Sequence, residues 1–154
     1  MKRAFLILAT GCLPLLVGCS VKPVAIDYGK DACHFCKMNI VDKTHAAERV
    51  TAKGKAFKYD ALECLVNDLE NHNDPNPALL LVANYQEVGS LIDAKSATYI
   101  ISKNIRSPMG ANLSALASHS AAERLQKEKQ GTIHSWDELV LNFDKLTNKH
   151  SLAP

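Results

Sequence analysis

The chain has 154 residues, of which 47% are hydrophobic and 22% are charged, and its 18 Lys and Arg residues nearly balance its 16 Asp and Glu residues. This size and composition suit one compact globular unit. Because the sequence has no basic stripe and no acidic block, it argues against nucleic acid or another polyelectrolyte as a partner.

The first 18 residues have the pattern of an export signal. Lys2 and Arg3 precede an almost wholly apolar run over residues 4–17, which is shorter than the roughly 20 residues of a usual membrane span. The run ends in Leu16-Val17-Gly18-Cys19, which resembles the lipobox of bacterial lipoproteins. We therefore expect a signal peptide that is cleaved before Cys19.

Lipid on Cys19 would fix where the protein works. Two or three acyl chains on one Cys hold a small protein at a bilayer, since each buried methylene contributes ~0.8 kcal/mol. Cys12 is a weaker candidate because it would leave a very short apolar region, and Ser20 after Cys19 favours sorting to an outer membrane. The prediction is a lipid-anchored protein that has lost residues 1–18 and faces the periplasm.

The mature chain begins with a polar stretch and continues into short predicted elements. Residues 19–31 mix Lys, Pro, Gly and Asp, and we expect a lipidated tether and a turn without stable structure. Lys53-Gly54 suits a tight hairpin between two strands, and Asp60 suits the N-cap of an amphipathic helix. The predicted elements of this first unit, residues 32–84, are strands at 46–52 and 55–59, a helix at 61–71 and a strand at 78–83.

A similar order recurs over residues 85–148. Gly131 is placed to end a helix, and Ser135 with Glu138 has the pattern of a capping box. The predicted elements are a strand at 97–102, an irregular segment or second strand at 109–118, a helix at 120–130, a strand at 132–134 and a helix from 135 to about 146. The predicted fold class is α+β, with two tandem strand-strand-helix-strand (ββαβ) units packed together and a C-terminal helix. An accidental alternation of elements would produce the same apparent repeat.

Sulfur-bearing residues are scarce after the export signal, where the chain has two methionines and four cysteines. Cys33, Cys36 and Met38 fall within six residues, and Met109 lies in a Pro-Met-Gly turn where no apolar stripe would bury it. Thiolate and thioether donors favour Cu(I) over harder ions, and a small number of them leaves the ion open to exchange. The pattern predicts one exchangeable Cu(I) site formed by Cys and Met side chains, although Met109 by itself does not decide between a ligand and an ordinary turn residue.

The same residues would also suit roles without copper. Cys33 and Cys36 are placed for a local disulfide that fastens the tether, or for a membrane-anchored thiol–disulfide oxidoreductase, which is the alternative function. Met38 would also suit an apolar anchor beside Ile40, and Cys64 is interpreted as a small buried residue among apolar helix positions. Because no acid–base pair and no nucleophile with a poised base is found, the chain is predicted not to be an enzyme.

The histidines give a weaker indication of metal binding than the sulfur-bearing residues do. His34 lies inside the sulfur cluster and His45 lies near it in sequence, so each is a candidate to complete the coordination, with exposure to solvent as the alternative. The other four are interpreted as bystanders: His72, His119, His134 and His150.

Four blocks of the chain carry a family resemblance. They are residues 34–40 (His-Phe-Cys-Lys-Met-Asn-Ile), residues 54–65, Ser107-Pro108-Met109-Gly110 and residues 133–139. In this order and spacing they resemble the NosL family of copper lipoproteins. The resemblance implies two similar ββαβ units and a chaperone that supplies Cu(I) for the copper centres of nitrous oxide reductase.

The resemblance also carries over to single residues. Cys36 and Met38 match the family's Cys-x-Met, and Met109 matches the Met of its Met-Gly turn, whereas Cys33 is an addition. The implied partners are nitrous oxide reductase or its assembly factors, a copper donor protein, and the membrane through lipid on Cys19. A homodimer and a heterodimer are both left open.

Overall fold

The computed structural model describes residues 20–71 and 77–151. The expected signal peptide and Cys19 lie outside these described residues. Within the described ranges, no helix combines the length and the apolar character needed to cross a bilayer.

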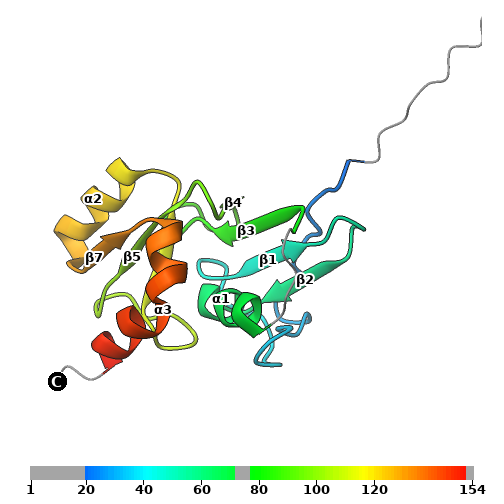
Figure 1. Ribbon diagram of the computed structural model, residues 1–154, viewed down its shortest axis with the longest axis horizontal. Coiled ribbons are helices and arrows are strands. Elements are labelled where there is room, and N and C mark those ends of the chain that lie inside the picture. Colours follow the sequence, from blue (N-terminus) through cyan, green and yellow to red (C-terminus); the bar gives the residue numbers. More distant parts are fainter. Residues whose placement is uncertain (1–19, 72–76, 152–154) are drawn as a thin grey trace, which may run out of the picture.

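The first half folds into a four-stranded antiparallel sheet with one helix (Figure 1). The sheet has the order β2-β1-β3-β4. Each strand and the helix predicted for this half is present, shortened by one to three residues. Strand β4 was not predicted, and it lies in the stretch between the strands predicted at 78–83 and 97–102, where no element was expected. The elements are β1 (Ala47–Val50), β2 (Ala56–Tyr59), α1 (Leu62–Asn71), β3 (Leu79–Ala83) and β4 (Leu91–Asp93).

The second half repeats this arrangement with a three-stranded antiparallel sheet in the order β6-β5-β7. Its elements are β5 (Thr98–Ile101), β6 (Leu113–Leu116), α2 (His119–Lys129) and β7 (Thr132–His134), and α3 (Trp136–Ser151) follows. In both sheets the first strand of the unit is flanked by the second strand and by the strand after the helix. The prediction of two tandem ββαβ units with a C-terminal helix is confirmed, and β6 resolves the alternatives for residues 109–118.

Side-chain caps set where the last two helices begin. Ser118 Oγ accepts a hydrogen bond from the Ala121 backbone N–H at 3.2 Å. At the start of α3 the predicted capping box is present: the Ser135 N–H donates to Glu138 Oε2 at 2.9 Å, and the Glu138 N–H donates to Ser135 Oγ at 3.3 Å. Each cap satisfies backbone donors that a helix start leaves unpaired.

The end of α2 differs by one residue from the expected stop at Gly131. Gln130 has a positive φ of 58°, and its N–H donates to the Gln126 carbonyl. Gly131 follows with φ of 111°, and a Cβ at this position would collide with the Ile101 carbonyl oxygen. The glycine is therefore needed for the close approach of the chain to β5.

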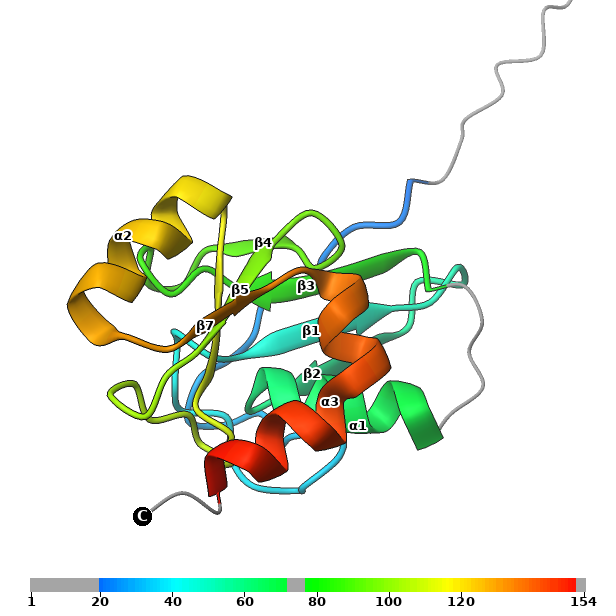
Figure 2. The same ribbon diagram turned by 60° about the vertical axis from the view of Figure 1, so that its left-hand side comes forward.

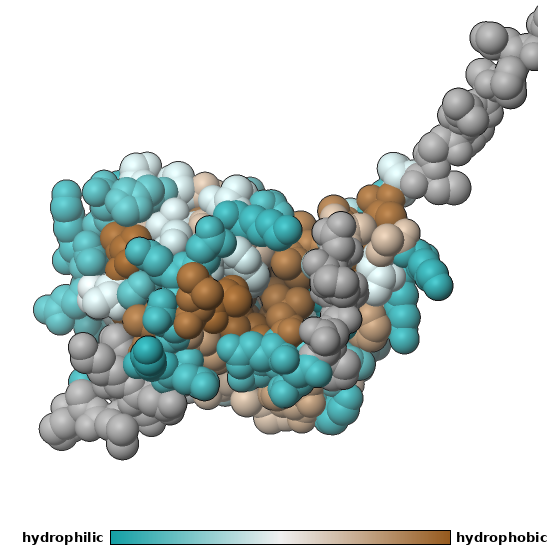
Figure 3. All heavy atoms as spheres, viewed as in Figure 1, coloured by the Kyte–Doolittle hydropathy of each residue, from teal (hydrophilic) through white to brown (hydrophobic). Residues whose placement is uncertain are grey.

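The two units share their larger hydrophobic core. Along β5, Tyr99 and Ile101 face this core, whereas Ile100 faces a smaller core beneath α2, because successive strand residues point to opposite faces. Helix α3 packs onto the larger core, to which Trp136 and Phe143 belong. Figures 2 and 3 show α3 crossing toward the first sheet and hydrophobic residues gathered between the two.

The expectation that residues 20–31 lack stable structure is wrong for most of the segment. The Val24 N–H donates to the buried carboxylate of Glu48 at 2.7 Å, and Lys58 Nζ donates to the Ala25 carbonyl at 2.7 Å. Tyr28 packs against the larger core. No local pattern indicates this docking, because its partners lie on strands far along the chain.

Candidate metal centre

Three thiols meet at one place beside α1. The Sγ atoms of Cys33, Cys36 and Cys64 all lie within 4.8 Å of one another, and all three cysteines are reduced. Among the side chains that the structure describes, in residues 20–71 and 77–147, this is the one group of three or more His, Cys, Asp or Glu residues placed to hold a metal ion.

A tight loop and the start of a helix bring these thiols together. The Cys33 N–H donates to the Met38 carbonyl at 2.7 Å, and the Lys37 N–H donates to the Cys33 carbonyl at 3.1 Å. Lys37 takes the left-handed conformation, with φ of 65°, which reverses the chain and sets Cys36 beside Cys33. Cys64, in the first turn of α1, completes the group.

Hydrogen bonds within the group determine which thiol ionises. The hydrogen bond from Cys64 is the largest cause that lowers the pKa of Cys33 to about 4, although burial opposes it. The same bond, together with burial, raises the pKa of Cys64, and burial raises the pKa of Cys36. At neutral pH the group therefore holds one thiolate, at Cys33, and two protonated thiols.

The sulfur atoms differ in their access to solvent. Cys33 and Cys64 are buried, with 1% and 0% of their surface exposed, and Cys36 is partly exposed. Met38, in the same loop, is 48% exposed, and Met109 is 40% exposed. Any ion or partner therefore approaches the group from the side of Cys36 and Met38.

Met109 lies beside a different face of α1. It lines a cavity of about 260 Å³ together with Glu63 and Asn67 of α1 and Phe143 of α3. The structure thus brings the predicted Cys33, Cys36 and Met38 into one loop, and places Met109 in a neighbouring depression. Cys64 joins the thiols, although it was interpreted as an ordinary buried residue.

Asp60 does not act as the predicted N-cap. Helix α1 begins at Leu62, two residues further on, and the Asp60 carboxyl is buried, with its Oδ1 atom lacking a hydrogen-bond partner. Burial raises the pKa of Asp60, and the negative charge of Cys33 raises it further. The carboxyl is thus part of the polar surroundings of the thiols and does not cap the helix.

His34 is directed toward a buried ion pair and is not a member of the thiol group. Its Nε2 atom lies 3.9 Å from Asp68 Oδ1. On the other carboxylate oxygen, Arg49 Nη2 donates to Asp68 Oδ2 at 3.1 Å and the Tyr59 hydroxyl donates to it at 2.6 Å. Through His34, this network braces the Cys33–Cys36 loop.

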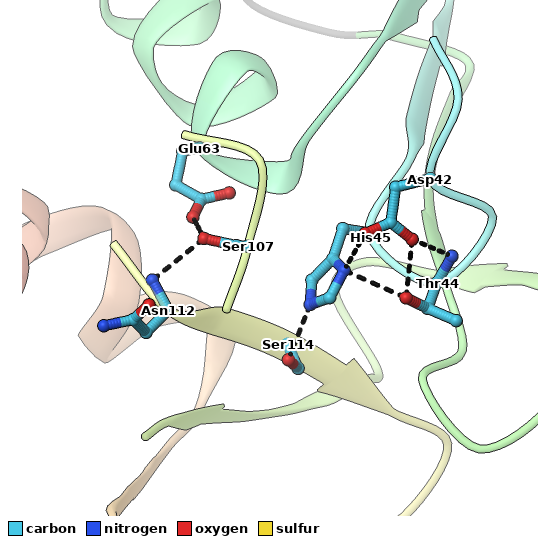
Figure 4. A network of polar contacts seen from close by, with 7 residues as sticks. All are labelled: Asp42, Thr44, His45, Glu63, Ser107, Asn112 and Ser114. Carbon is cyan, nitrogen blue, oxygen red and sulfur yellow. Dashed lines mark hydrogen bonds and ion pairs between the residues drawn. The ribbon is translucent and has the colours of Figure 1, made fainter. Parts of the chain in front are cut away.

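His45 is buried at the junction of the two units, where both ring nitrogens have partners (Figure 4). Its Nδ1 atom lies 2.8 Å from Asp42 Oδ2 and 2.9 Å from Thr44 Oγ1, and its Nε2 atom lies 3.0 Å from Ser114 Oγ on β6. Although a Ser, a His and an Asp are in line, the buried Ser114 has no access for a substrate. The structure uses His45 to join the first unit to β6.

One signal in the sequence pointed to Cys64. It lies within the 54–65 block, one of the four on which the family resemblance rests. Its position between Leu62 and Leu65 suggested burial, which is correct. Burial and membership of a sulfur group are compatible, because a helix start can direct one side chain toward an adjacent loop.

Three comparisons agree with this architecture. The NosL family model matches residues 23–142. The copper-binding lipoprotein NosL of Stutzerimonas stutzeri is 29% identical over 128 residues, which cover 78% of this chain and 67% of that protein. The crystal structure of the copper chaperone NosL from Shewanella denitrificans has a TM-score of 0.64 at 18% identity, covering 77% of this chain and 96% of that one, which confirms the fold.

The two relatives are described as a copper-binding lipoprotein and a copper chaperone. Neither description is of an enzyme, in agreement with the prediction from the sequence. Since the family model extends over most of the described structure, from before β1 into α3, this chain belongs to the NosL family.

Proposed function

We propose that this protein is a copper chaperone that carries one Cu(I) ion in the group formed by Cys33, Cys36 and Cys64. The observation that supports the proposal is the meeting of three Sγ atoms within 4.8 Å at a partly exposed position. Sulfur donors favour Cu(I) over harder ions. Membership of a family with copper-binding relatives supports copper as the cargo.

The unequal exposure of the sulfur atoms supports exchange over storage. Cys33 and Cys64 retain the ion from the buried side, while Cys36, Met38 and Met109 are open to an incoming donor. A partner's sulfur can therefore attack the ion before all the original bonds are broken. A carrier needs this stepwise ligand replacement, because a closed cage would release its ion slowly.

We further propose that the copper is delivered, directly or through assembly factors, to nitrous oxide reductase, and that a separate protein donates it. Lipid on Cys19 would hold the chaperone at the membrane, with the outer membrane favoured, facing the periplasm. The family resemblance supports these assignments. Copper content of the reductase from cells that lack this chain tests the delivery, and a full complement of copper there would contradict it.

The alternative function, a thiol–disulfide oxidoreductase, fits the structure less well. Such an enzyme needs an exposed thiol with a low pKa. Here the thiol whose pKa is low, Cys33, is buried, and the accessible thiol, Cys36, has a raised pKa. The ionised thiol and the accessible thiol are therefore different residues, whereas the enzyme requires both properties in one thiol.

The direct test is an anaerobic competition titration of the reduced, mature chain against a Cu(I) chelator. We expect one Cu(I) per chain, with the thiols intact by mass. A triple variant with Ser at positions 33, 36 and 64 is expected to lose the bound ion while keeping the fold. Retention of copper by that variant would contradict the proposed site.

Met109→Leu removes the thioether and keeps the volume of the side chain. We expect the Cu(I) affinity to fall by about tenfold or more, with little change in stability, because Met109 is 40% exposed. The same competition titration measures this change. Leu141→Ala, at a residue that is 81% exposed on α3, is a control for surface truncation, and equal affinities of Met109→Leu and the wild type would remove Met109 from the site.

The Cu(I) affinity is expected to rise with pH. Because the pKa values of Cys36 and Cys64 are raised, both thiols are protonated at neutral pH, and Cu(I) must displace their protons. Cys33, with a pKa of about 4, is already ionised and adds no slope. Between about pH 6 and pH 8 we expect a rise of about ten- to a hundredfold per pH unit, for one to two protons released. Titrations at several pH values check this, and a flat profile would show that neither Cys36 nor Cys64 binds the ion as a thiolate.

A further inference from the structure

The turn that carries Met109 is closed and anchored by one hydroxyl. We call residues 107–112 the Met109 turn. The Ser107 hydroxyl donates a hydrogen bond to Glu63 Oε1 of α1 and accepts one from the Asn112 N–H at 2.9 Å (Figure 4). The Gly110 N–H donates to the Ser107 carbonyl at 3.1 Å. Ser107 thus ties both ends of the turn to each other and to Glu63.

Helix α1 links this anchor to the thiols. Successive helix residues are rotated by about 100°, so Glu63 and Cys64 point to neighbouring faces of the same turn. Glu63 and Asn67 border the cavity that Met109 lines, whereas Cys64 joins Cys33 and Cys36. One rigid element therefore sets the position of the Met109 turn relative to the thiol group.

Glu63, which anchors the turn, is an unusual residue for a buried position. Glu63 is only 2% exposed, and its second carboxyl oxygen, Oε2, has no hydrogen-bond partner. Burying such a group is costly, and an apolar side chain would fill the space without that cost. Glu63 is not the sole contact between the first unit and β6, since His45 Nε2 also lies 3.0 Å from Ser114 Oγ on that strand. These observations favour a role for Glu63 beyond joining the two units.

We propose that Glu63, acting through Ser107, is a positioning residue that holds the Met109 thioether in place for Cu(I). Glu63 does not itself bind the ion. This inference rests on the proposed function, and in particular on Met109 as a copper ligand. The buried Glu63 carboxyl then serves to position the Met109 thioether, and its main role is not to stabilise the fold.

The test is a double-mutant cycle in which Cu(I) affinity is measured for Ser107→Ala, Met109→Leu and the double variant. Ser107→Ala is expected to lower the affinity by about three- to tenfold. In the Met109→Leu background the same substitution is expected to have no effect, because the thioether that it positions is gone. Ser107→Thr, which keeps the hydroxyl, is expected to bind Cu(I) as tightly as the wild type.

Ser114→Ala is the matched control, since it removes the other buried hydroxyl contact between the units without touching the Met109 turn. We expect it to lower the melting temperature and leave the Cu(I) affinity unchanged.

If Met109→Leu lowers the affinity and Ser107→Ala does not, the positioning role is overturned while the copper site stands. Equal losses for Ser107→Ala in both backgrounds would also overturn it, by showing a purely structural effect. If Met109→Leu has no effect, the thioether ligand itself is overturned, and the positioning role falls with it.

Discussion

Cys64→Ala is expected to lower the affinity for Cu(I) by about 100-fold or more, since it removes a buried donor that becomes a thiolate when copper binds. Cys64 lies within 4.8 Å of the other two sulfur atoms. If it were only a small apolar residue of α1, alanine would cost a little stability and leave copper binding intact. An anaerobic chelator competition, with thermal unfolding of the copper-free protein beside it, separates a ligand from a packing residue.

A matched control for Cys64→Ala is Val66→Ala, which shortens another fully buried side chain on the same helix. We expect Val66→Ala to destabilise the protein at least as much and to leave the affinity near that of the wild type. Similar copper affinities for the two variants would show that Cys64 serves packing alone. The loss should also appear in X-ray absorption as a smaller number of sulfur neighbours around copper.

Arg49→Ala is expected to destabilise the copper-free protein by about 3–5 kcal/mol, because it takes the guanidinium away from the buried Asp68 carboxylate. The side chains of Arg49 and Asp68 are 4% and 1% exposed, and Arg49 also lies over the Phe57 ring, 4.3 Å from its centroid. Urea unfolding of reduced protein measures the change.

The control for Arg49→Ala is Lys30→Ala, which breaks the exposed ion pair with Asp27, where the side chains are 80% and 57% exposed. We expect an effect of less than about 1 kcal/mol there, since water and salt screen such pairs. If Arg49→Ala were equally mild, the buried network would not be what braces the Cys33–Cys36 loop.

Local patterns were sufficient to predict most of the fold. The Ser135–Glu138 capping box and the apolar face of α1 depend on residues close in sequence, and both are as predicted. The docking of Val24 on Glu48 and the displacement of Asp60 from the helix start were not. Each of those depends on the tertiary partner available to a polar group, which overrides local preference.

The candidate metal centre was predictable in part for the same reason. Cys33 and Cys36 are neighbours in sequence, so their meeting follows from a short loop. Cys64 is brought to them only by the packing of α1 against that loop, 28 residues beyond Cys36 in the chain. The junction at His45 and Ser114 spans 69 residues, and composition and spacing give no information about such distant contacts.

Docking of the N-terminal segment onto the first sheet limits how far a lipid-anchored form of this protein can move from the bilayer. With lipid on Cys19, as proposed, the free leash ends at Val24, whose backbone is held by Glu48, so it spans at most about 18 Å when fully extended. The folded part of the protein would then stay in a thin layer next to the bilayer. Under the proposed function, the copper donor and the recipient would both have to come to that layer, and the ion would be collected and delivered at the membrane surface.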